Sequence, residues 1–596
     1  MTARPVERHH VWIPTDGGAV AACLHLPADR NVRAHPVVIC PPFGYEYTHA
    51  HRSLLHLADD LAAAGFLAVR LDYVGTGDSE GDASTPDLLE RWVASITATA
   101  ADAGVLTGGG PATLIGLRFG ALLAGLAAGR VDVHDLVAWH PVSSGKRYIR
   151  EHEALQSVAA HVPQPSTGKI EAGGFVLSAE TAQAVRSVDL SVASFRVRGS
   201  ALVVERDDLP SDGRLAERLG ASGLGVETMV GAGYLGMMAE PQYTVVPQGT
   251  LDSIVAWLSA RDTAPERLLE GPALDRLLIS RTARWSESGT EIVEEMVSME
   301  TDQGTPLVGV LTAPAGPSTG AVVLANSGSV HHVGPNRLYV ELSRALARGG
   351  VACLRLDLRN LGDSRLGDCA NENHPYPATA VEDVRCGVDW LRRQRHQPSC
   401  VVAGLCSGAY TAFHAGLDPT LPIHGVVCLN PLTFQWQDGM SLDTPDSHRT
   451  TRDAQYYKGA VRNWGKWKRL LTGQANTGYI IRFAAKRARD VLKKGLENAA
   501  ERVGLRATGL LGRRLEQYRS RGLPLTFVFS TRDPGHAILT SEAGPVLKRL
   551  LRQNALAVSF IEGADHTFSR EAWRVQASEA VSAAVATMHG AGAQGR

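Results

Sequence analysis

The 596-residue sequence lacks several features that would assign it to a specialised class of protein. No apolar run approaches the roughly 18–20 residues needed to cross a bilayer, and the first residues contain no apolar segment typical of a signal peptide. The 8 cysteines are scattered without a CxxC pair, and no HExxH motif is present. These absences disfavour a disulfide-stapled secreted domain and a zinc enzyme. We therefore expect a globular, cytoplasmic protein that needs no metal or other cofactor.

An internal repeat is the most informative pattern that is present. Single hydrophobic cores stop growing at around 250–300 residues, so a chain of this length favours two domains. The segments Arg70–Ser79 and Arg355–Ser364 both begin with Arg-Leu-Asp and end with Gly-Asp-Ser at the same spacing. Helical patterns precede them at Leu54–Ala64 and Leu338–Arg348. Short apolar strands that alternate with such helices predict a mostly parallel sheet in each half.

A third repeated motif carries chemistry. Gly116–Gly120 and Gly404–Gly408 are both G-x-X-x-G turns that follow an apolar strand and precede a helix rich in small residues. This is the context of a nucleophile elbow, in which the glycines allow a sharp turn and the central residue is exposed at the edge of the sheet. The central residue is Arg118 in the first half and Cys406 in the second.

In these motifs both halves resemble the α/β-hydrolase superfamily. The resemblance implies two tandem α/β-hydrolase domains, each a mostly parallel sheet flanked by helices and interrupted by a cap insertion. We expect a first domain over residues 1–260 with a cap at about 143–196, and a linker over 261–291. A second domain follows over residues 292–596, with a cap at about 433–521.

The second half contains a candidate catalytic triad in the order that the superfamily uses, nucleophile, acid and histidine. Cys406 would attack an acyl carbonyl as a thiolate. His566, in a loop after an apolar strand, would transfer the proton, and Asp533, also after a strand, would orient the imidazole. Ser407 is a competing nucleophile one position beyond the elbow centre. Asp565 is an alternative acid, although adjacent side chains rarely face each other.

The developing oxyanion needs hydrogen-bond donors, for which we expect backbone N–H groups of Ser407 and of the loop at Gly328 and Ser329. His331 and His332 follow in the sequence. We expect them to be an exposed loop pair rather than metal ligands.

The first half fails the same test. Its elbow centre is Arg118, and Tyr234 occupies the position of the histidine, while Asp207 or Asp208 retains the acid position. Acyl-enzyme chemistry is therefore not expected there, because arginine stays protonated. Two interpretations remain: a degenerate domain kept for packing, which we favour, or a site where Arg118 binds a carboxylate or phosphate.

A cysteine nucleophile favours an acyl-transfer enzyme that acts on an ester or thioester donor. Water, an amine or a hydroxyl would be the acceptor, so both a thioesterase and an acyltransferase fit. A non-catalytic scaffold and a simple carboxylesterase are the alternatives.

The segment from residue 449 to residue 521 has 19 Lys and Arg against 5 Asp and Glu. This basic cap is a candidate contact for an acyl carrier protein or an anionic membrane surface. Nucleic acid is not expected, because no binding motif accompanies the charge. Caps of this kind resemble those of hydrolase-like proteins in bacterial glycan or secondary-metabolite biosynthesis.

Overall fold

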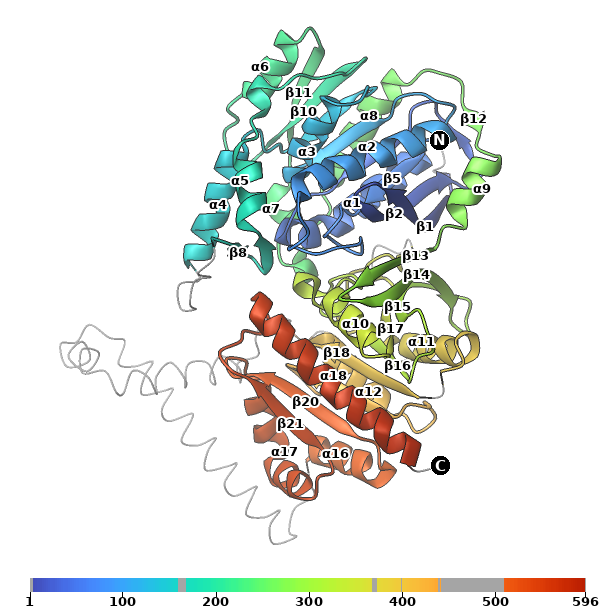
Figure 1. Cartoon of the computed structure of the whole chain (residues 1–596), viewed down its shortest axis with the longest axis vertical. Coiled ribbons are helices and arrows are strands. Elements are labelled where there is room, and N and C mark those ends of the chain that lie inside the picture. The colour runs from blue at the N-terminus through green and yellow to red at the C-terminus, as the bar shows by residue number, and fades with distance from the viewer. Residues whose placement is uncertain are drawn as a thin grey trace, which may run out of the picture.

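The computed structural model describes residues 4–158, 168–366, 372–397, 399–437, 440 and 509–594. The chain forms two sheets, one in each half, and the halves lie one above the other along the long axis of the molecule (Figure 1). Among the described residues no helix combines the length and the apolar character needed to cross a membrane.

The first sheet has eight strands in the order β1-β2-β5-β4-β6-β7-β10-β11. Only β2 runs antiparallel to its two neighbours, and the other pairs are parallel. Helices α1 and α8 cover one face, and α2 and α3 cover the other. The bounds are β1 (Val6–Thr15), β2 (Gly18–Pro27), β4 (Val37–Cys40), α1 (Tyr45–Ala63), β5 (Ala68–Leu71), α2 (Leu88–Leu106), β6 (Thr113–Leu117), α3 (Phe119–Ala128), β7 (Leu136–Trp139), β10 (Ser200–Arg206), β11 (Gly225–Gly231) and α8 (Gln248–Arg261).

The second sheet has nine strands in the order β13-β14-β15-β17-β16-β18-β19-β20-β21. Helices α10 and α18 cover one face, and α11, α12, α16 and α17 cover the other. The bounds are β13 (Thr282–Glu287), β14 (Thr290–Glu300), β15 (Pro306–Pro314), β16 (Ala321–Ala325), α10 (Leu338–Arg348), β17 (Ala352–Leu356), α11 (Ala380–Gln394), β18 (Cys400–Leu405), α12 (Ser407–Leu417), β19 (Gly425–Leu429), α16 (Leu510–Arg521), β20 (Leu525–Ser530), α17 (Gly535–Arg552), β21 (Ala557–Ile561) and α18 (Glu571–Gln594).

Apart from the additional strand β13, the two sheets share one strand order, and the predicted fold class is confirmed. The proposed linker contains β12 (Arg267–Leu268), α9 (Pro272–Leu278) and β13. The first cap contains α4 (Gly145–Val158), the hairpin of β8 (Ile170–Ala172) and β9 (Phe175–Leu177), and α5 (Ala179–Arg186). The domain boundaries stay predictions, and most of the second cap lies outside the described residues.

The repeated Arg-Leu-Asp and Gly-Asp-Ser elements form the same turn in each half. In the first, the carboxylate of Asp72 accepts a hydrogen bond from the Asp78 N–H at 2.9 Å, and the Ser79 hydroxyl donates to the Asp72 carbonyl at 2.7 Å. Gly77 has a φ of 48°, and a Cβ there would lie 2.1 Å from Cγ of Asp72. Glycine is therefore required at this point of the turn. Asp357, Gly362, Asp363 and Ser364 repeat these contacts in the second half.

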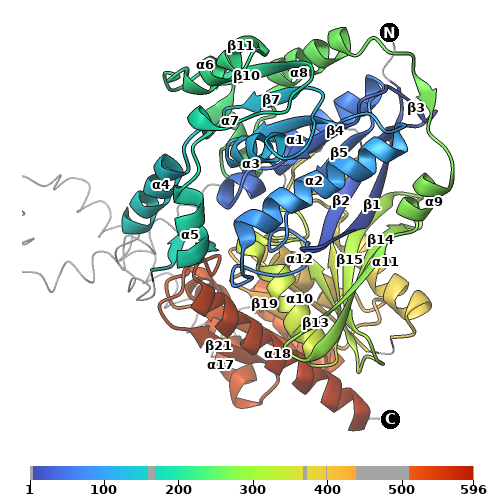
Figure 2. The same ribbon diagram turned by 45° about the horizontal axis from the view of Figure 1, so that its top comes forward.

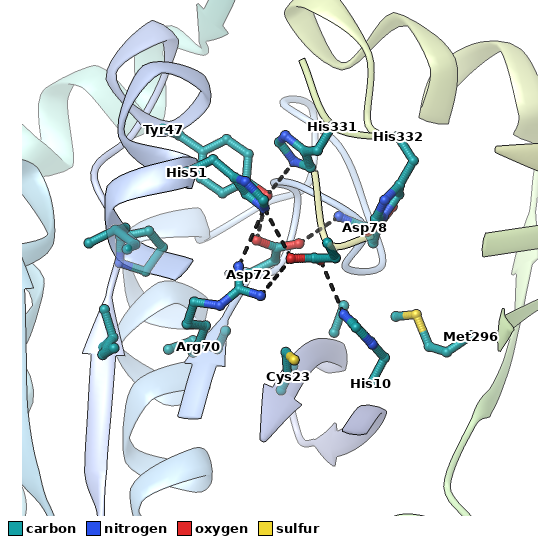
Figure 3. Close-up of a pocket in the computed structure, with 17 residues that line it drawn as sticks. His10, Cys23, Tyr47, His51, Arg70, Asp72, Asp78, Met296, His331 and His332 are labelled. Carbon is teal, nitrogen blue, oxygen red and sulfur yellow. Dashed lines mark hydrogen bonds and ion pairs between the residues drawn. The ribbon is translucent and has the colours of Figure 1, made fainter. Parts of the chain in front are cut away.

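The remaining charges of the motif cross to the other half. Arg70 of the first half binds Asp363 of the second, with Nη2 2.6 Å from Oδ1. In return, Arg355 of the second half binds Asp78 of the first. His10 and His51 lie near Arg70 (Figure 3). Their ring nitrogens lie 3.1 and 3.5 Å from the Asp363 carboxylate. Buried ion pairs therefore join the two halves reciprocally.

The histidine pair at 331–332 is a correction to the sequence analysis. Both side chains are buried rather than exposed, because the loop that holds them lies between the two halves. His332 donates to Asp357 of its own half and to Asp78 of the first half, each at 2.7 Å. His331 lies 3.2 Å from the Tyr47 hydroxyl (Figure 3). Sequence periodicity could not reveal this burial, since the covering residues are more than 250 positions away.

Candidate active site

Cys406 lies at a strained elbow. It is the single residue between β18 and α12, with φ 58° and ψ −114°. Such a conformation is costly for a residue with a side chain and is typical of functional sites. A Cβ at Gly404 would lie 2.3 Å from the carbonyl carbon of Gly408, and one at Gly408 would lie 2.5 Å from the Ala325 oxygen. The two glycines therefore allow the close approach that leaves Cys406 partly exposed at the strand end.

The histidine and the acid arrive from the two neighbouring strands. Asp533 follows β20 and His566 follows β21, and the Nδ1 atom of His566 lies 2.6 Å from Oδ2 of Asp533. The other Asp533 oxygen accepts the Gly535 N–H at 2.7 Å, which fixes the carboxylate in a fully buried position. The imidazole is therefore held by Nδ1, and Nε2 is left for Cys406.

Charge stabilises this arrangement. Burial disfavours the imidazolium, but interactions with Cys406 and with the hydrogen-bonded Asp533 carboxylate outweigh burial and hold the pKa of His566 well above its ordinary value. The imidazole is therefore placed to take the proton of the Cys406 thiol, the step that produces the reactive form of a cysteine nucleophile.

Tyr376 is a site residue that the sequence analysis missed. It lines the same cavity as Cys406 and interacts with that residue. Burial, and then the charge of Cys406, raise the pKa of Tyr376 well above its usual value, so the phenol stays a neutral O–H donor. Its ring stacks on Trp436 at 4.3 Å between centroids. No motif in the sequence marks this tyrosine, because a loop far from the elbow delivers it.

The expected oxyanion donors differ in their surroundings. Ser407 and Gly328 both line the cavity above Cys406. Ser407 begins α12, where first-turn N–H groups have no partner within the helix. The Gly328 N–H donates to the Ser407 hydroxyl at 2.8 Å, and the Ser329 hydroxyl donates to the Asn373 carbonyl at 2.8 Å. The adjacent Ser327 also lines the cavity, and the oxyanion roles stay predictions.

Ser407 and Asp565, the alternative nucleophile and the alternative acid, both form hydrogen bonds that stabilise neighbouring loops. The Ser407 side chain is buried and holds the Gly328 loop through the hydrogen bond just described. The Asp565 carboxylate accepts hydrogen bonds from the Ser569 N–H, at 2.9 Å, and from the Ser569 hydroxyl. It is therefore bound to Ser569, whereas His566 is bound to Asp533.

Cys406 and His566 open into a cavity of about 470 Å³. Its walls come from both halves of the chain. A volume of this size is typical of a site for a small organic ligand.

The first half keeps the elbow, but the residue at its centre forms an ion pair. Arg118 has φ 54° and ψ −115°, almost the same conformation as Cys406. Its Nε binds the buried Glu46 carboxylate at 2.8 Å, and the Tyr234 hydroxyl donates to the same oxygen at 3.2 Å. Asp207 accepts the Gly233 N–H at 2.8 Å. Because Glu46 already neutralises Arg118, the contacts favour the packing interpretation over an anion site.

Among the described cysteines, only Cys406 and Cys386 are partly exposed. Burial, followed by nearby carboxylates, raises the pKa of Cys386 to about 11. Its thiol donates to the Glu300 carbonyl at 3.2 Å. The surroundings therefore disfavour reactivity at Cys386 at neutral pH.

Within the described residues, His332, Asp357 and Asp363 form one group that could supply metal ligands. Both nitrogens of His332 already bind carboxylates, and Asp363 binds Arg70. These donors neutralise one another, so the cluster is explained as an ionic contact. The basic cap, with its expected carrier-protein or membrane contact, lies almost entirely outside the described residues.

Comparisons with known proteins found a family model and solved structures to which the chain is similar. No curated protein matches the chain by sequence. Similar solved structures include a dienelactone hydrolase from Anabaena variabilis, with 12% identity over 51% of this chain and 96% of that one, at a TM-score of 0.30. Est1E from Butyrivibrio proteoclasticus, solved with ferulic acid bound, shares 17% identity over 42% and 98%, at 0.34. Brefeldin A esterase, described as a bacterial homologue of human hormone-sensitive lipase, shares 19% over 52% and 81%, at 0.31.

The model of the alpha/beta hydrolase family matches residues 322–584, the segment that runs from β16 into α18 and includes the elbow, the aspartate and the histidine described above. The second half of the chain therefore matches the alpha/beta hydrolase family, and the fold is that of an α/β-hydrolase.

Proposed function

We propose that the second half is an acyl-transfer enzyme that works through an acyl–Cys406 intermediate. The observation that carries the proposal is the contact of His566 with Asp533 at 2.6 Å on one side and with Cys406 on the other, at the floor of a cavity. A scaffold that binds without chemistry has no need for a buried carboxylate that orients an imidazole toward a strained thiol.

The chemistry follows from these contacts. The Cys406 thiolate attacks the carbonyl carbon of an ester or thioester, and the carbonyl oxygen becomes an oxyanion. The backbone N–H groups of Ser407 and Ser327, both of which line the cavity, are the proposed donors to that oxygen, because the Gly328 N–H is bound to the Ser407 hydroxyl. Each donor is of the kind worth about 3–4 kcal/mol. The bond to the leaving group then breaks, and the leaving alcohol or thiol takes the proton from Nε2 of His566.

The second step reverses these roles. His566 takes a proton from the acceptor, which attacks the thioester carbon and releases Cys406 as thiolate. The acceptor is water in a hydrolase and an amine or hydroxyl in a transferase. A thioester intermediate reacts readily with amines, which favours transfer over hydrolysis. The proposed acyl donors are free or carrier-linked acyl thioesters.

The test is intact-mass spectrometry after the whole chain is mixed with a panel of acyl thioesters. We expect an acyl adduct on Cys406 that is absent in Cys406→Ala and forms at least about 100-fold more slowly in His566→Ala. Cys386→Ala is the matched control, because among the described cysteines it removes the other partly exposed thiol, and it should acylate like the wild type. A wild-type chain that forms no adduct with any donor would refute the proposal and favour a binding role. Rapid turnover of simple esters without an acceptor would identify a carboxylesterase.

A further inference from the structure

We propose that the first half, although its own cleft lacks a nucleophile and a histidine, forms one wall of the second half's acyl cavity and selects uncharged acyl groups with a flat aromatic ring. This inference rests on the proposed function, since it names the substrate class of the same site.

The wall is built from three pieces of the first half. Tyr45, Thr48 and His49 lie on one face of α1, since residues three and four positions apart share a helix face. Phe175 comes from the start of β9, in the cap hairpin, and Gln242 comes from the segment before α8. All five line the cavity that contains Cys406 and His566.

The second half holds the cap hairpin in place. Arg570 binds the Glu171 carboxylate at 2.9 Å, and Arg574 donates to the Gly174 carbonyl at 3.0 Å. A Cβ at Gly174 would lie 1.8 Å from the Asn336 side-chain oxygen, so the hairpin turn packs directly on the second half. Figures 1 and 2 show this part of the first half beside α18. Phe175 is thus positioned by the helix that follows the His566 loop.

The opposite side of the cavity is joined in the same way. Asn373 donates to the Pro241 carbonyl at 2.7 Å, and Arg52 binds Glu372 at 2.8 Å. Both second-half residues belong to the loop that delivers Tyr376 to Cys406. The first half therefore holds a loop of the reactive centre as well as a wall of the cavity.

The lining chemistry defines the ligand. Phe175 and Tyr45 from the first half, and the stacked pair of Tyr376 and Trp436 from the second, supply aromatic faces suited to a planar ring. Among the described lining residues there is no Lys or Arg, and Glu240 contributes a carboxylate. An acyl group that ends in a carboxylate would therefore meet repulsion from Glu240, and no Lys or Arg counter-ion among the lining residues that the structure describes. A neutral aromatic acyl group is not repelled by Glu240 and needs no counter-ion.

His49 adds a polar contact to this wall. Its Nδ1–H donates to the Met238 carbonyl at 2.9 Å, and burial lowers its pKa, so the ring is neutral and Nε2 is an acceptor. A hydroxyl on the distal ring of the ligand could donate to that nitrogen.

The experiment measures binding without catalysis. The rate at which iodoacetamide alkylates Cys406 in the whole chain is followed by mass spectrometry, in the presence of either of two unreactive amides. N-methylcinnamamide is neutral and aromatic, and N-methylsuccinamate ends in a carboxylate. We expect the cinnamamide to protect Cys406 and the succinamate to have little effect. Equal protection by both compounds, or protection by the succinamate alone, would overturn the inference.

Three variants locate the wall. In Phe175→Ala the cinnamamide concentration for half-protection should rise about tenfold, through the loss of a ring contact. Leu209→Ala is the matched control, because Leu209 is an exposed apolar residue of the first half that lines the Arg118 cleft instead, and it should behave like the wild type. Glu240→Gln, at an exposed position, should improve protection by the succinamate several-fold and leave the cinnamamide unchanged. An unchanged cinnamamide response in Phe175→Ala would contradict the first-half wall, and Glu240→Gln tests it even if Phe175→Ala fails to fold.

The two proposals fail separately. If no thioester acylates Cys406 but the protection pattern holds, the acyl-transfer function is wrong and the binding wall stands. If Cys406 acylates but Phe175→Ala and Glu240→Gln change neither response, the wall is wrong and the acyl-transfer function stands.

Discussion

Replacing Asp78 with Asn tests whether the reciprocal ion pairs hold the two halves together. Asp78 is 5% exposed, and its carboxylate binds both Arg355 and His332 of the second half. Asparagine keeps the shape but removes the charge. Of the ion pairs that fully buried Arg355 forms with described residues, the one with the Glu294 carboxylate at 3.5 Å would then remain. Removing one partner of a buried pair typically costs about 3–5 kcal/mol, because the other charge stays buried without compensation.

The assay is urea unfolding of the whole chain at pH 7, followed by circular dichroism and fluorescence. With a slope of about 3 kcal/mol per molar urea, this loss lowers the midpoint by about 1–2 M. Asp212→Asn is the control, because Asp212 forms an exposed pair with Arg147 at 2.8 Å, and it should change the free energy of unfolding by less than about 1 kcal/mol. A loss in Asp78→Asn as small as in this control would refute the claim that the buried pairs join the halves.

Three further predictions follow from the described contacts. Asp533→Asn should slow acylation of Cys406 by about 10²–10⁴-fold, measured by mass spectrometry, since the neutral amide no longer stabilises the imidazolium; an unchanged rate would assign the acid role elsewhere. Arg118→Ala should lower the free energy of unfolding by about 3–5 kcal/mol in urea, because it strands the buried Glu46 carboxylate, and should leave the acylation rate unaltered; a changed rate at unchanged stability would favour an anion-binding role. Burial lowers the pKa of His332, but the Asp78 and Asp357 carboxylates outweigh burial and hold this pKa well above its ordinary value. The contribution of His332 to the free energy of unfolding is therefore complete below about pH 6.5 and is lost as pH rises through the folded-state pKa. The stability difference between wild type and His332→Gln should therefore shrink from pH 6 to pH 10, and a difference that grows with pH would reverse the assigned sign.

Local patterns in the sequence predicted those parts of the site that local structure determines. The elbow at Cys406 is a strand, a turn and a helix within 20 residues, and its glycines are required by contacts within that same segment. Asp533 and His566 each follow an apolar strand, and adjacent parallel strands bring their ends together. The contact between Asp533 and His566 at 2.6 Å therefore agrees with the strand pattern of the sequence.

Other contacts depend on the docking of the two halves, which no periodicity encodes. His331 and His332 were expected to be exposed because their segment is a loop, and burial comes from residues of the first half. Tyr376 reaches Cys406 from a loop that Pro241 and Arg52 of the first half hold. The repeated Gly-Asp-Ser was a usable signal. The turn requires the serine and the glycine of this motif, but it does not use the carboxylate of the aspartate. A repeated aspartate of this kind indicates a charged partner outside the turn, which here is an arginine of the other half.

The charges around this interface also explain why the two different halves pair with each other. Asp59 of the first half binds Arg365 of the second at 2.6 Å. The corresponding positions, 285 residues away, carry the opposite sign: Arg344 corresponds to Asp59, and Glu80 corresponds to Arg365. In a contact between two copies of the second half, Arg344 would meet Arg365, and between two copies of the first half Asp59 would meet Glu80. Like charges at a partly buried contact are unfavourable, so the sign change disfavours both like pairings and leaves the observed one. The opposite charges at these corresponding positions therefore favour the arrangement in which the first half lies beside the Cys406 cavity.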